Sequence, residues 1–195
     1  MKEYYDTRAP EYDDWWLQRG LYAARDLPDW AAERDRALAA VAALPPKKTL
    51  DVACGTGFVT RLLPGEVVGL DQSPAMLEIA RSQAPAATFV HGEGMALPFP
   101  DGSFDRVFTS HFYGHLEEDD RTRFLEEARR LAPELVVFDA ALHDGEPRGL
   151  WQERVLNDGS QWSVYKRFFS SDVLLDELGG GSVLHEGRWF VLVAS

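Results

Sequence analysis

Residues 50–57 read Leu-Asp-Val-Ala-Cys-Gly-Thr-Gly, a short apolar run that ends in two closely spaced glycines. Gly55 and Gly57 allow the backbone to turn tightly and to approach a ligand closely. The next apolar run, residues 66–71, ends in Asp71, whose carboxylate can accept hydrogen bonds from the hydroxyls of a ribose. Open α/β sheets bind ligands at the carboxyl ends of their strands, so the spacing predicts such a site here. A helix is expected to follow the glycines and to point its N–H groups at the ligand.

Further strands and helices alternate along the chain. Short apolar runs predict strands over 87–90, 105–109 and 135–139. Helical periodicity or capping predicts helices over 31–44 and 75–83, the latter capped by Ser73, over a stripe from Phe124 to Leu131, and around Leu174 to Leu178. This alternation is typical of a doubly wound, mostly parallel sheet with helices on both faces. Residues 182–185 and 188–194 predict an antiparallel hairpin at the sheet edge.

One domain accounts for the whole chain of 195 residues. Residues 1–46 are interpreted as an N-terminal helical lid, and residues 47–195 as the α/β core. The stretch 140–170 has no clear period and is a candidate for a substrate-side insertion, since loops of that length in compact domains are often functional.

Composition disfavours several classes of partner. The formal net charge is −12, which disfavours nucleic acid and anionic membrane surfaces. A single cysteine, Cys54, allows no intrachain disulfide and is interpreted as a small buried residue. The polar N-terminus is unlike a signal peptide, and no apolar run approaches a membrane span, so a cytoplasmic location is expected. No metal site is indicated, and the oligomeric state is not indicated either.

Three motifs together resemble the class I S-adenosylmethionine-dependent methyltransferases. Residues 50–57 resemble the first motif of that family, and residues 68–77 resemble its second-strand motif. Residues 91–105 are similar to its adenine-side motif, and residues 4–13 to its lid segment. The chain looks most like the small-molecule branch related to the ubiquinone and menaquinone biosynthesis enzymes. The resemblance implies S-adenosylmethionine as cofactor and methyl transfer to a small molecule by in-line displacement.

The resemblance also implies which residues bind the cofactor. The loop would line the methionine end, Asp71 would take the ribose, the residues after the third expected strand would hold the adenine, and two lid tyrosines would cover the whole. The implied residues are Tyr5, Tyr12, Asp51, Ala53, Gly55, Gly57, Asp71, Gln72, Met76, Glu93, Gly94, Met95 and Ser110. Two positions depart from the family: Ala53 replaces the first loop glycine, and residues 131–135 lack the glycine pair that precedes the fifth strand.

The hexapeptide 110–115 follows the fourth expected strand and contains the candidate catalytic residues His111, Tyr113 and His115. A base is needed only if the acceptor must lose a proton. The competing interpretation is that these side chains merely line the site. His143 is a weaker candidate of the same kind.

Aromatic residues raise a similar alternative. Trp151, Trp162, Tyr165 and Phe168 would either line an acceptor pocket or form the core of their own segment, and Trp15 and Trp16 are expected to pack.

Three other functions compete with small-molecule methylation. A cofactor-binding protein without catalysis would carry the same motifs. A nicotinamide-dependent oxidoreductase is disfavoured, because Thr60 stands where its third glycine would be. Methylation of protein or nucleic acid is disfavoured by the acidic charge.

Overall fold

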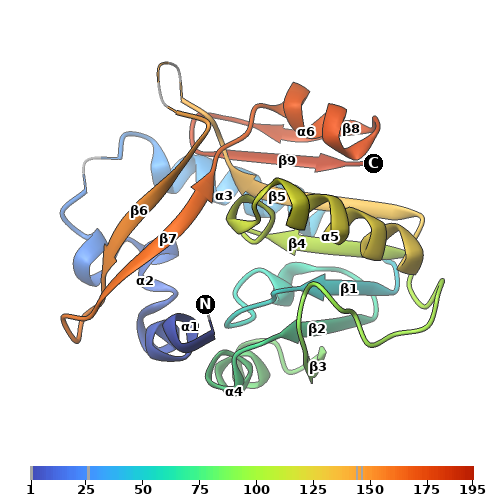
Figure 1. The fold of residues 1–195 in the computed structure, drawn as a ribbon, viewed down its shortest axis with the longest axis horizontal. Coiled ribbons are helices and arrows are strands. Elements are labelled where there is room, and N and C mark those ends of the chain that lie inside the picture. The colour runs from blue at the N-terminus through green and yellow to red at the C-terminus, as the bar shows by residue number, and fades with distance from the viewer. Residues whose placement is uncertain (1, 26, 144, 146) are drawn as a thin grey trace.

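The computed structural model describes residues 2–25, 27–143, 145 and 147–195 (Figure 1). One sheet has the strand order β3-β2-β1-β4-β5-β9-β8. The strand bounds are β1 Thr49–Val52, β2 Val67–Asp71, β3 Thr88–His91, β4 Arg106–Ser110, β5 Glu134–Ala140, β8 Ser182–Glu186 and β9 Phe190–Ala194. Strands β1 to β5 pair in parallel, whereas β9 is antiparallel to β5 and to β8. The predicted doubly wound sheet with an antiparallel C-terminal hairpin is confirmed.

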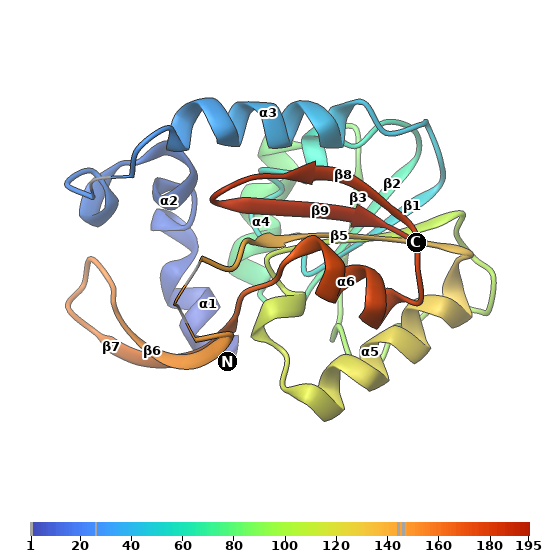
Figure 2. The same ribbon diagram turned by 90° about the horizontal axis from the view of Figure 1, so that it is seen from above.

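Helices cover both faces of the sheet (Figure 2), with α3 (Trp30–Ala42) on one side and α5 (Glu118–Leu131) and α6 (Ser171–Leu178) on the other. Along β5, Leu135 and Val137 belong to the core under α5 and α6, while Val136 and Phe138 belong to the core under α3. Successive side chains of a strand point to opposite faces, so a strand covered on both sides must be apolar throughout. This explains why the strands appear as continuous apolar runs.

Helix α4 (Pro74–Gln83) begins as expected. The side chain of Ser73 accepts a hydrogen bond from the backbone N–H of Met76 at 3.2 Å, and Pro74 occupies the first turn. The cap fixes where the chain leaves β2 and therefore where Asp71 lies.

The helix expected after the glycine loop is not formed, and that prediction was wrong. Only a 3₁₀ turn, Thr60–Leu62, follows the loop. Few residues separate Gly57 from Pro64, and a proline disfavours helical geometry at the residue before it. The loop consequently offers single backbone N–H groups rather than a helix terminus.

A second sheet occupies the stretch that had no clear period. Strands β6 (Gly149–Val155) and β7 (Gln161–Arg167) pair antiparallel with each other and form a separate two-stranded sheet. Asp158-Gly159 lies in the turn between them, and this dipeptide is a hairpin signal that could have predicted the pair. Figure 1 shows the hairpin projecting away from the main sheet beside the N-terminal helices.

The N-terminal segment crosses from the hairpin to the core. Its elements are α1 (Lys2–Arg8), a 3₁₀ turn at Ala9–Glu11, α2 (Asp14–Leu17) and a 3₁₀ turn at Gly20–Tyr22. Asp6 accepts a hydrogen bond from the hydroxyl of Ser73 at 2.5 Å, and Asp13 accepts from Thr56 at 2.6 Å. These bonds hold the segment over the ends of β1 and β2. No helix of the described residues has the length and apolar character needed to cross a bilayer.

Candidate active site

The carboxyl ends of the parallel strands meet where the strand order reverses, between β1 and β4. These strands are neighbours in the sheet although β2 and β3 separate them in sequence. Such reversal points are where open α/β sheets bind ligands. Two cavities lie at this edge, with volumes of about 220 and about 710 Å³.

The smaller cavity gathers most of the residues implied in cofactor binding. Those that line it are Tyr5, Tyr12, Ala53, Gly55, Asp71, Gln72, Met76, Glu93, Gly94, Met95 and Ser110. They come from the lid and from the ends of β1, β2, β3 and β4, so segments far apart in sequence meet at one place. Asp51 and Gly57 do not line this cavity.

Asp71 is fixed by backbone hydrogen bonds at the end of β2. Its Oδ2 accepts from the N–H of Gly55 at 2.9 Å, and its Oδ1 accepts from the N–H of Ser73 at 2.9 Å. Burial raises the pKa of this carboxyl, although these backbone hydrogen bonds oppose the change. A carboxylate oxygen has more than one lone pair, so both oxygens can still accept hydrogen bonds from a ligand.

Asp51 lies at the end of β1 and lines the larger cavity. Its Oδ2 accepts a hydrogen bond from the Thr60 hydroxyl at 2.6 Å, whereas its buried Oδ1 has no partner among the described residues. Burial raises the pKa of Asp51 to about 7, and Thr60 opposes that change. A buried carboxylate oxygen without a partner is costly, and a cationic ligand group would relieve the cost.

Gly57 and Ala53, two further positions of the glycine loop, have positive φ. Gly57 (φ +77°) packs on α4, and a Cβ there would lie 3.1 Å from the Cα of Ala80. Ala53 has φ +58°, a left-handed conformation that costs L-residues other than glycine roughly 1–2 kcal/mol. The family's usual glycine at the position of Ala53 therefore matches a real backbone requirement.

Substitutions at Ala53 should separate this strain from other effects. Ala53→Gly is expected to change the free energy of unfolding by less than about 1 kcal/mol, because relief of strain offsets the greater freedom of the unfolded chain. Ala53→Val is expected to cost about 2 kcal/mol or more, because β-branched residues resist positive φ. Urea denaturation of both variants measures the difference, and equal stabilities would contradict it.

The lid closes the smaller cavity with two tyrosines. The ring of Tyr12 lies over the glycine loop. It is so close that a Cβ added at Gly55 would lie 3.5 Å from Cε1 of Tyr12. The rings of Tyr5 and Tyr12 lie 6.5 Å apart between centroids. Burial raises the pKa of Tyr5 to about 12, so this hydroxyl is neutral at physiological pH.

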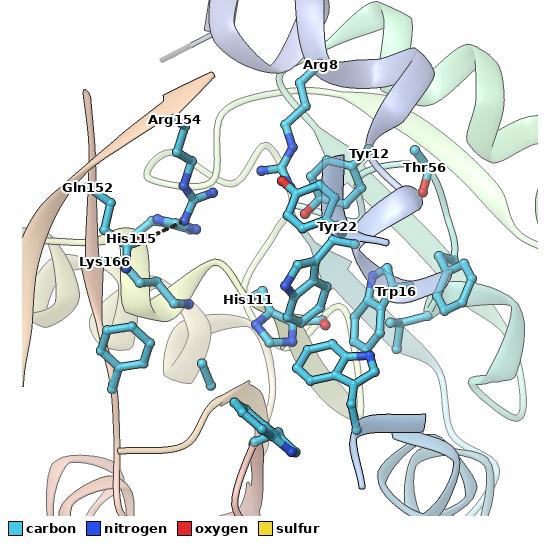
Figure 3. A pocket seen from close by; sticks show the side chains of 18 of the residues that line it. Arg8, Tyr12, Trp16, Tyr22, Thr56, His111, His115, Gln152, Arg154 and Lys166 are labelled. Carbon is cyan, nitrogen blue, oxygen red and sulfur yellow. Dashed lines mark hydrogen bonds between the residues drawn. The ribbon is translucent and has the colours of Figure 1, made fainter. Parts of the chain in front are cut away.

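The larger cavity lies between the lid, the ends of β1, β4 and β5, and the β6–β7 hairpin. Figure 3 shows some of the side chains that surround it. Among them are Arg8 from the lid and Arg154 and Lys166 from the hairpin. Lys166 is buried and forms an ion pair with the buried carboxylate of Asp139. Burial raises the pKa of Asp139, but the nearby Lys166 and His111 and the hydrogen bonds from Lys166 and the backbone together outweigh it, so the pKa is lowered.

Five residues line both cavities and so form the junction between them: Tyr12, Ala53, Ser110, His111 and His115. His115 Nδ1 lies 2.6 Å from the carbonyl oxygen of Tyr165. A carbonyl only accepts, so Nδ1 carries the proton and Nε2 holds the lone pair. Burial lowers the pKa of His115 well below its ordinary value, so the ring is neutral at physiological pH.

His111 differs from His115 in its surroundings. It has φ +54°, and its ring lies 4.8 Å from that of Trp15 and 5.2 Å from that of Trp16. Burial lowers its pKa to about 3, although Asp139 lies 3.6 Å from Nδ1 and opposes that change. The structure does not bring Tyr113 to the junction: its ring is fully buried and its hydroxyl donates to Glu177 at 2.7 Å.

The comparisons with known proteins agree with this geometry. Residues 50–134 match the family model described as a methyltransferase domain. A solved complex described as DhpI with SAM and HEP is 28% identical, with a TM-score of 0.78 over 98% of this chain and 94% of that chain. These similarities place the domain at residues 50–134 among the class I S-adenosylmethionine-dependent methyltransferases.

Curated relatives of this methyltransferase domain include two quinone enzymes. The demethylmenaquinone methyltransferase of Thermotoga maritima is 40% identical over 132 residues, which are 65% of this chain and 54% of the relative. That of Thermus thermophilus is 41% identical over 67% of this chain and 61% of its own length. The chain thus spans little more than half the length of these relatives.

A more distant solved structure shares the fold. A solved structure from Thermotoga maritima, described as a possible histamine N-methyltransferase, has a TM-score of 0.68 at 21% identity. It covers 100% of this chain and 98% of that chain, which supports the fold alone.

The residues of this site fit S-adenosylmethionine chemically. The unpartnered Oδ1 of Asp51 suits the ammonium of the methionine part, and both oxygens of Asp71 suit the ribose hydroxyls. The backbone of the glycine loop borders the same space at Gly55, which has no side chain.

The open question about the aromatic residues has a mixed answer. Phe168 lines the larger cavity, whereas Trp151 is 60% exposed. Trp162 packs on Tyr4 at 5.7 Å between centroids and lines neither cavity. Trp16 stacks on Phe58 and Phe190, as packing predicts, and also lines the larger cavity, as Trp15 does.

Sequence reasoning missed Arg8, Arg154 and Lys166 as cavity residues. The Asp158-Gly159 turn between their two strands is the local signal that could have pointed to the last two.

Proposed function

We propose that this chain binds S-adenosylmethionine in the smaller cavity and transfers its methyl group to a small molecule in the larger cavity. The observation that carries the proposal is the junction, where five residues line both cavities at the ends of β1 and β4 and on the lid. A volume of about 710 Å³ lies within the range of small-molecule sites, roughly 300–1,000 Å³. The cytoplasmic location expected from composition stays a prediction.

The protein's main task in this reaction is alignment. S-adenosylmethionine supplies a methyl group that its sulfonium already activates. Holding two reactants in line contributes up to roughly 7–11 kcal/mol in favourable cases. The residues of the smaller cavity would fix one reactant, the walls of the larger cavity would fix the other, and Tyr5 and Tyr12 would exclude water.

His115 is the best placed proton acceptor at the junction. Its Nε2 holds a lone pair because Nδ1 donates to Tyr165, and the ring is neutral because burial lowers its pKa. An acceptor hydroxyl would lose its proton to this nitrogen. Tyr113 is not part of the proposal, because it lines neither cavity.

The calorimetric titration of the protein with S-adenosylhomocysteine tests the cofactor, with NAD as the control ligand. Micromolar-range binding of the first and none of the second is expected. Binding of NAD instead would favour the oxidoreductase alternative. Product formation from a panel of small acceptors then separates an enzyme from a cofactor-binding protein without catalysis.

Removal of the imidazole should reduce turnover without affecting the cofactor. With a hydroxyl acceptor from the panel, His115→Ala is expected to lower the rate of product formation by about a hundredfold. The affinity for S-adenosylhomocysteine should stay unchanged. The wild-type rate should not fall through protonation of His115 between about pH 8 and about pH 6, because its folded pKa lies below that window. A variant rate within about threefold of wild type would reduce His115 to a lining residue.

A further inference from the structure

The larger cavity carries positive charge in an acidic protein. The chain has a net charge of −12, yet Arg8, Arg25, Arg154 and Lys166 all line this cavity. The charge of Lys166 is balanced by Asp139. The two junction histidines are neutral, because burial lowers the pKa of each. Two carboxyl groups, those of Asp51 and Glu153, also line the cavity, but neither forms an ion pair with Arg8 or Arg154. Arg25 is exposed, so Arg8 and Arg154 are the cations of the cavity that are at least partly buried and have no carboxylate partner among the described residues.

Arg8 is a buried cation whose hydrogen-bond partners are neutral. It is 6% exposed and donates to the hydroxyls of Tyr4 at 2.7 Å and Tyr22 at 3.3 Å. Its Nε is buried without a hydrogen-bond partner. Among the described residues, no carboxylate forms an ion pair with it. Buried charges are almost always paired, so this guanidinium has an unfilled requirement for an anion.

Arg154 brings a second guanidinium to the same place. It donates to the hydroxyl of Tyr4 at 3.3 Å, the group that also binds Arg8, and to the side chain of Gln152 at 3.1 Å. No carboxylate of the described residues forms an ion pair with Arg154. Figure 3 shows Arg8 and Arg154 reaching from the lid and from the hairpin into the same part of the cavity, above His111 and His115.

Like charges this close repel each other, and an anion between them would turn that repulsion into attraction. We propose that the methyl acceptor carries an oxyanion, a carboxylate or a phosphate-type group, and that the guanidinium groups of Arg8 and Arg154 bind it. Guanidinium groups suit this task because their N–H fork matches two oxygens of such a group. The inference rests on the proposed function, because it assigns the larger cavity to the acceptor.

The carboxylate of the cofactor's own methionine part is the other source of an oxyanion. Asp51 and Thr56 of the glycine loop also line the larger cavity, so the methionine end would lie near its wall. The test therefore begins with protein saturated with S-adenosylhomocysteine, in which that carboxylate is already bound.

The experiment compares benzoate with benzamide, two probes of nearly the same shape of which only the first is an anion. Calorimetric titration of the saturated wild type is expected to give an affinity about tenfold higher for benzoate. Arg154→Gln should abolish this preference and leave the affinity for S-adenosylhomocysteine within about threefold. Arg19→Gln, an exposed lid residue that lines neither cavity, is the matched control for loss of one positive charge and should keep the preference.

Equal binding of benzoate and benzamide to the saturated wild type would overturn the proposal, without reference to any variant. A second pair of results would also overturn it: Arg154→Gln binds S-adenosylhomocysteine more weakly than the wild type, and S-adenosylhomocysteine displaces benzoate. The arginines would then hold the cofactor rather than the acceptor. If S-adenosylhomocysteine fails to bind the wild type while benzoate is still preferred, the proposed function fails and the oxyanion site is supported. Thermal unfolding of each variant confirms that it is folded.

Discussion

Replacing Asp71 with alanine is expected to weaken the binding of S-adenosylhomocysteine by about a hundredfold or more. The carboxylate lines the smaller cavity and is held in place by the N–H groups of Gly55 and Ser73. Hydrogen bonds to a charged group contribute about 1.5–3 kcal/mol each, so the loss of two to a ribose gives this magnitude. The change also removes the acceptor that holds Gly55 in the loop. Calorimetric titration measures the affinity.

The conservative variant Asp71→Asn separates charge from shape. It keeps one side-chain oxygen as an acceptor but replaces the other with a donor, which faces a backbone N–H. An intermediate loss of affinity is therefore expected. Thermal unfolding of both variants controls for global destabilisation. An affinity of Asp71→Ala within about threefold of wild type would place the cofactor elsewhere.

Lys166→Met is expected to lower the free energy of unfolding by about 3–5 kcal/mol, because it leaves the carboxylate of Asp139 buried without its cation. Asp139 is fully buried on β5, and its remaining partners are the N–H groups of Gly114 and Ala140. Nδ1 of His111 also lies 3.6 Å from that carboxylate, but burial lowers the pKa of His111 to about 3, so its neutral ring does not replace the lost cation at neutral pH. Urea denaturation at neutral pH measures the loss.

The pH dependence of this loss has a definite sign. In the wild type the pKa of Asp139 is lowered, so its contribution to stability is present above the unfolded pKa and is lost as pH falls through the folded one. In Lys166→Met, burial without the ammonium raises that pKa, so the folded state takes up a proton before the unfolded state. The difference between the two proteins should therefore shrink from about pH 8 to about pH 5.

The double variant Asp139→Asn with Lys166→Met completes the cycle. It removes both charges, so it should be more stable than Lys166→Met alone. A double variant that loses the sum of the two single effects would show that the buried pair is not coupled. A constant difference between wild type and Lys166→Met across the pH range would contradict the charge argument.

The sequence predicted the main sheet well because its signals are local. Strands β1, β2, β4 and β5 are short apolar runs that are buried in the sheet, and Ser73 and Pro74 mark the start of α4. The hairpin β6–β7 escaped prediction because only some of its side chains face the protein. Trp151 and Val155 are exposed on it, so hydrophobicity along these strands does not mark one face.

The candidate site was predictable to different degrees in its two halves. Many residues around the smaller cavity directly follow strands of the sheet. Sequence motifs at the strand ends therefore predict which side chains lie close together. Their binding roles stay predictions. The larger cavity depends on contacts between distant segments, such as Arg154 with Tyr4, and no local pattern encodes these. The helix predicted after the glycine loop is a case in which the motif was misleading. Pro64 follows too soon for a helix, and only a 3₁₀ turn forms.

The β6–β7 hairpin is a structural unit with its own internal ladder. All seven of its paired positions lie between its own two strands, and a bridge between Ala141 and Phe169 joins its base to the core. Apart from Lys166, which pairs with Asp139 of β5, cavity-lining residues of the hairpin such as Gln152 and Arg154 can therefore be substituted without disturbing the hydrogen bonds of the main sheet. Donor recognition and acceptor recognition would then be inherited as separate modules. A hairpin grafted from a related protein could change which molecule is methylated while the donor site keeps its shape.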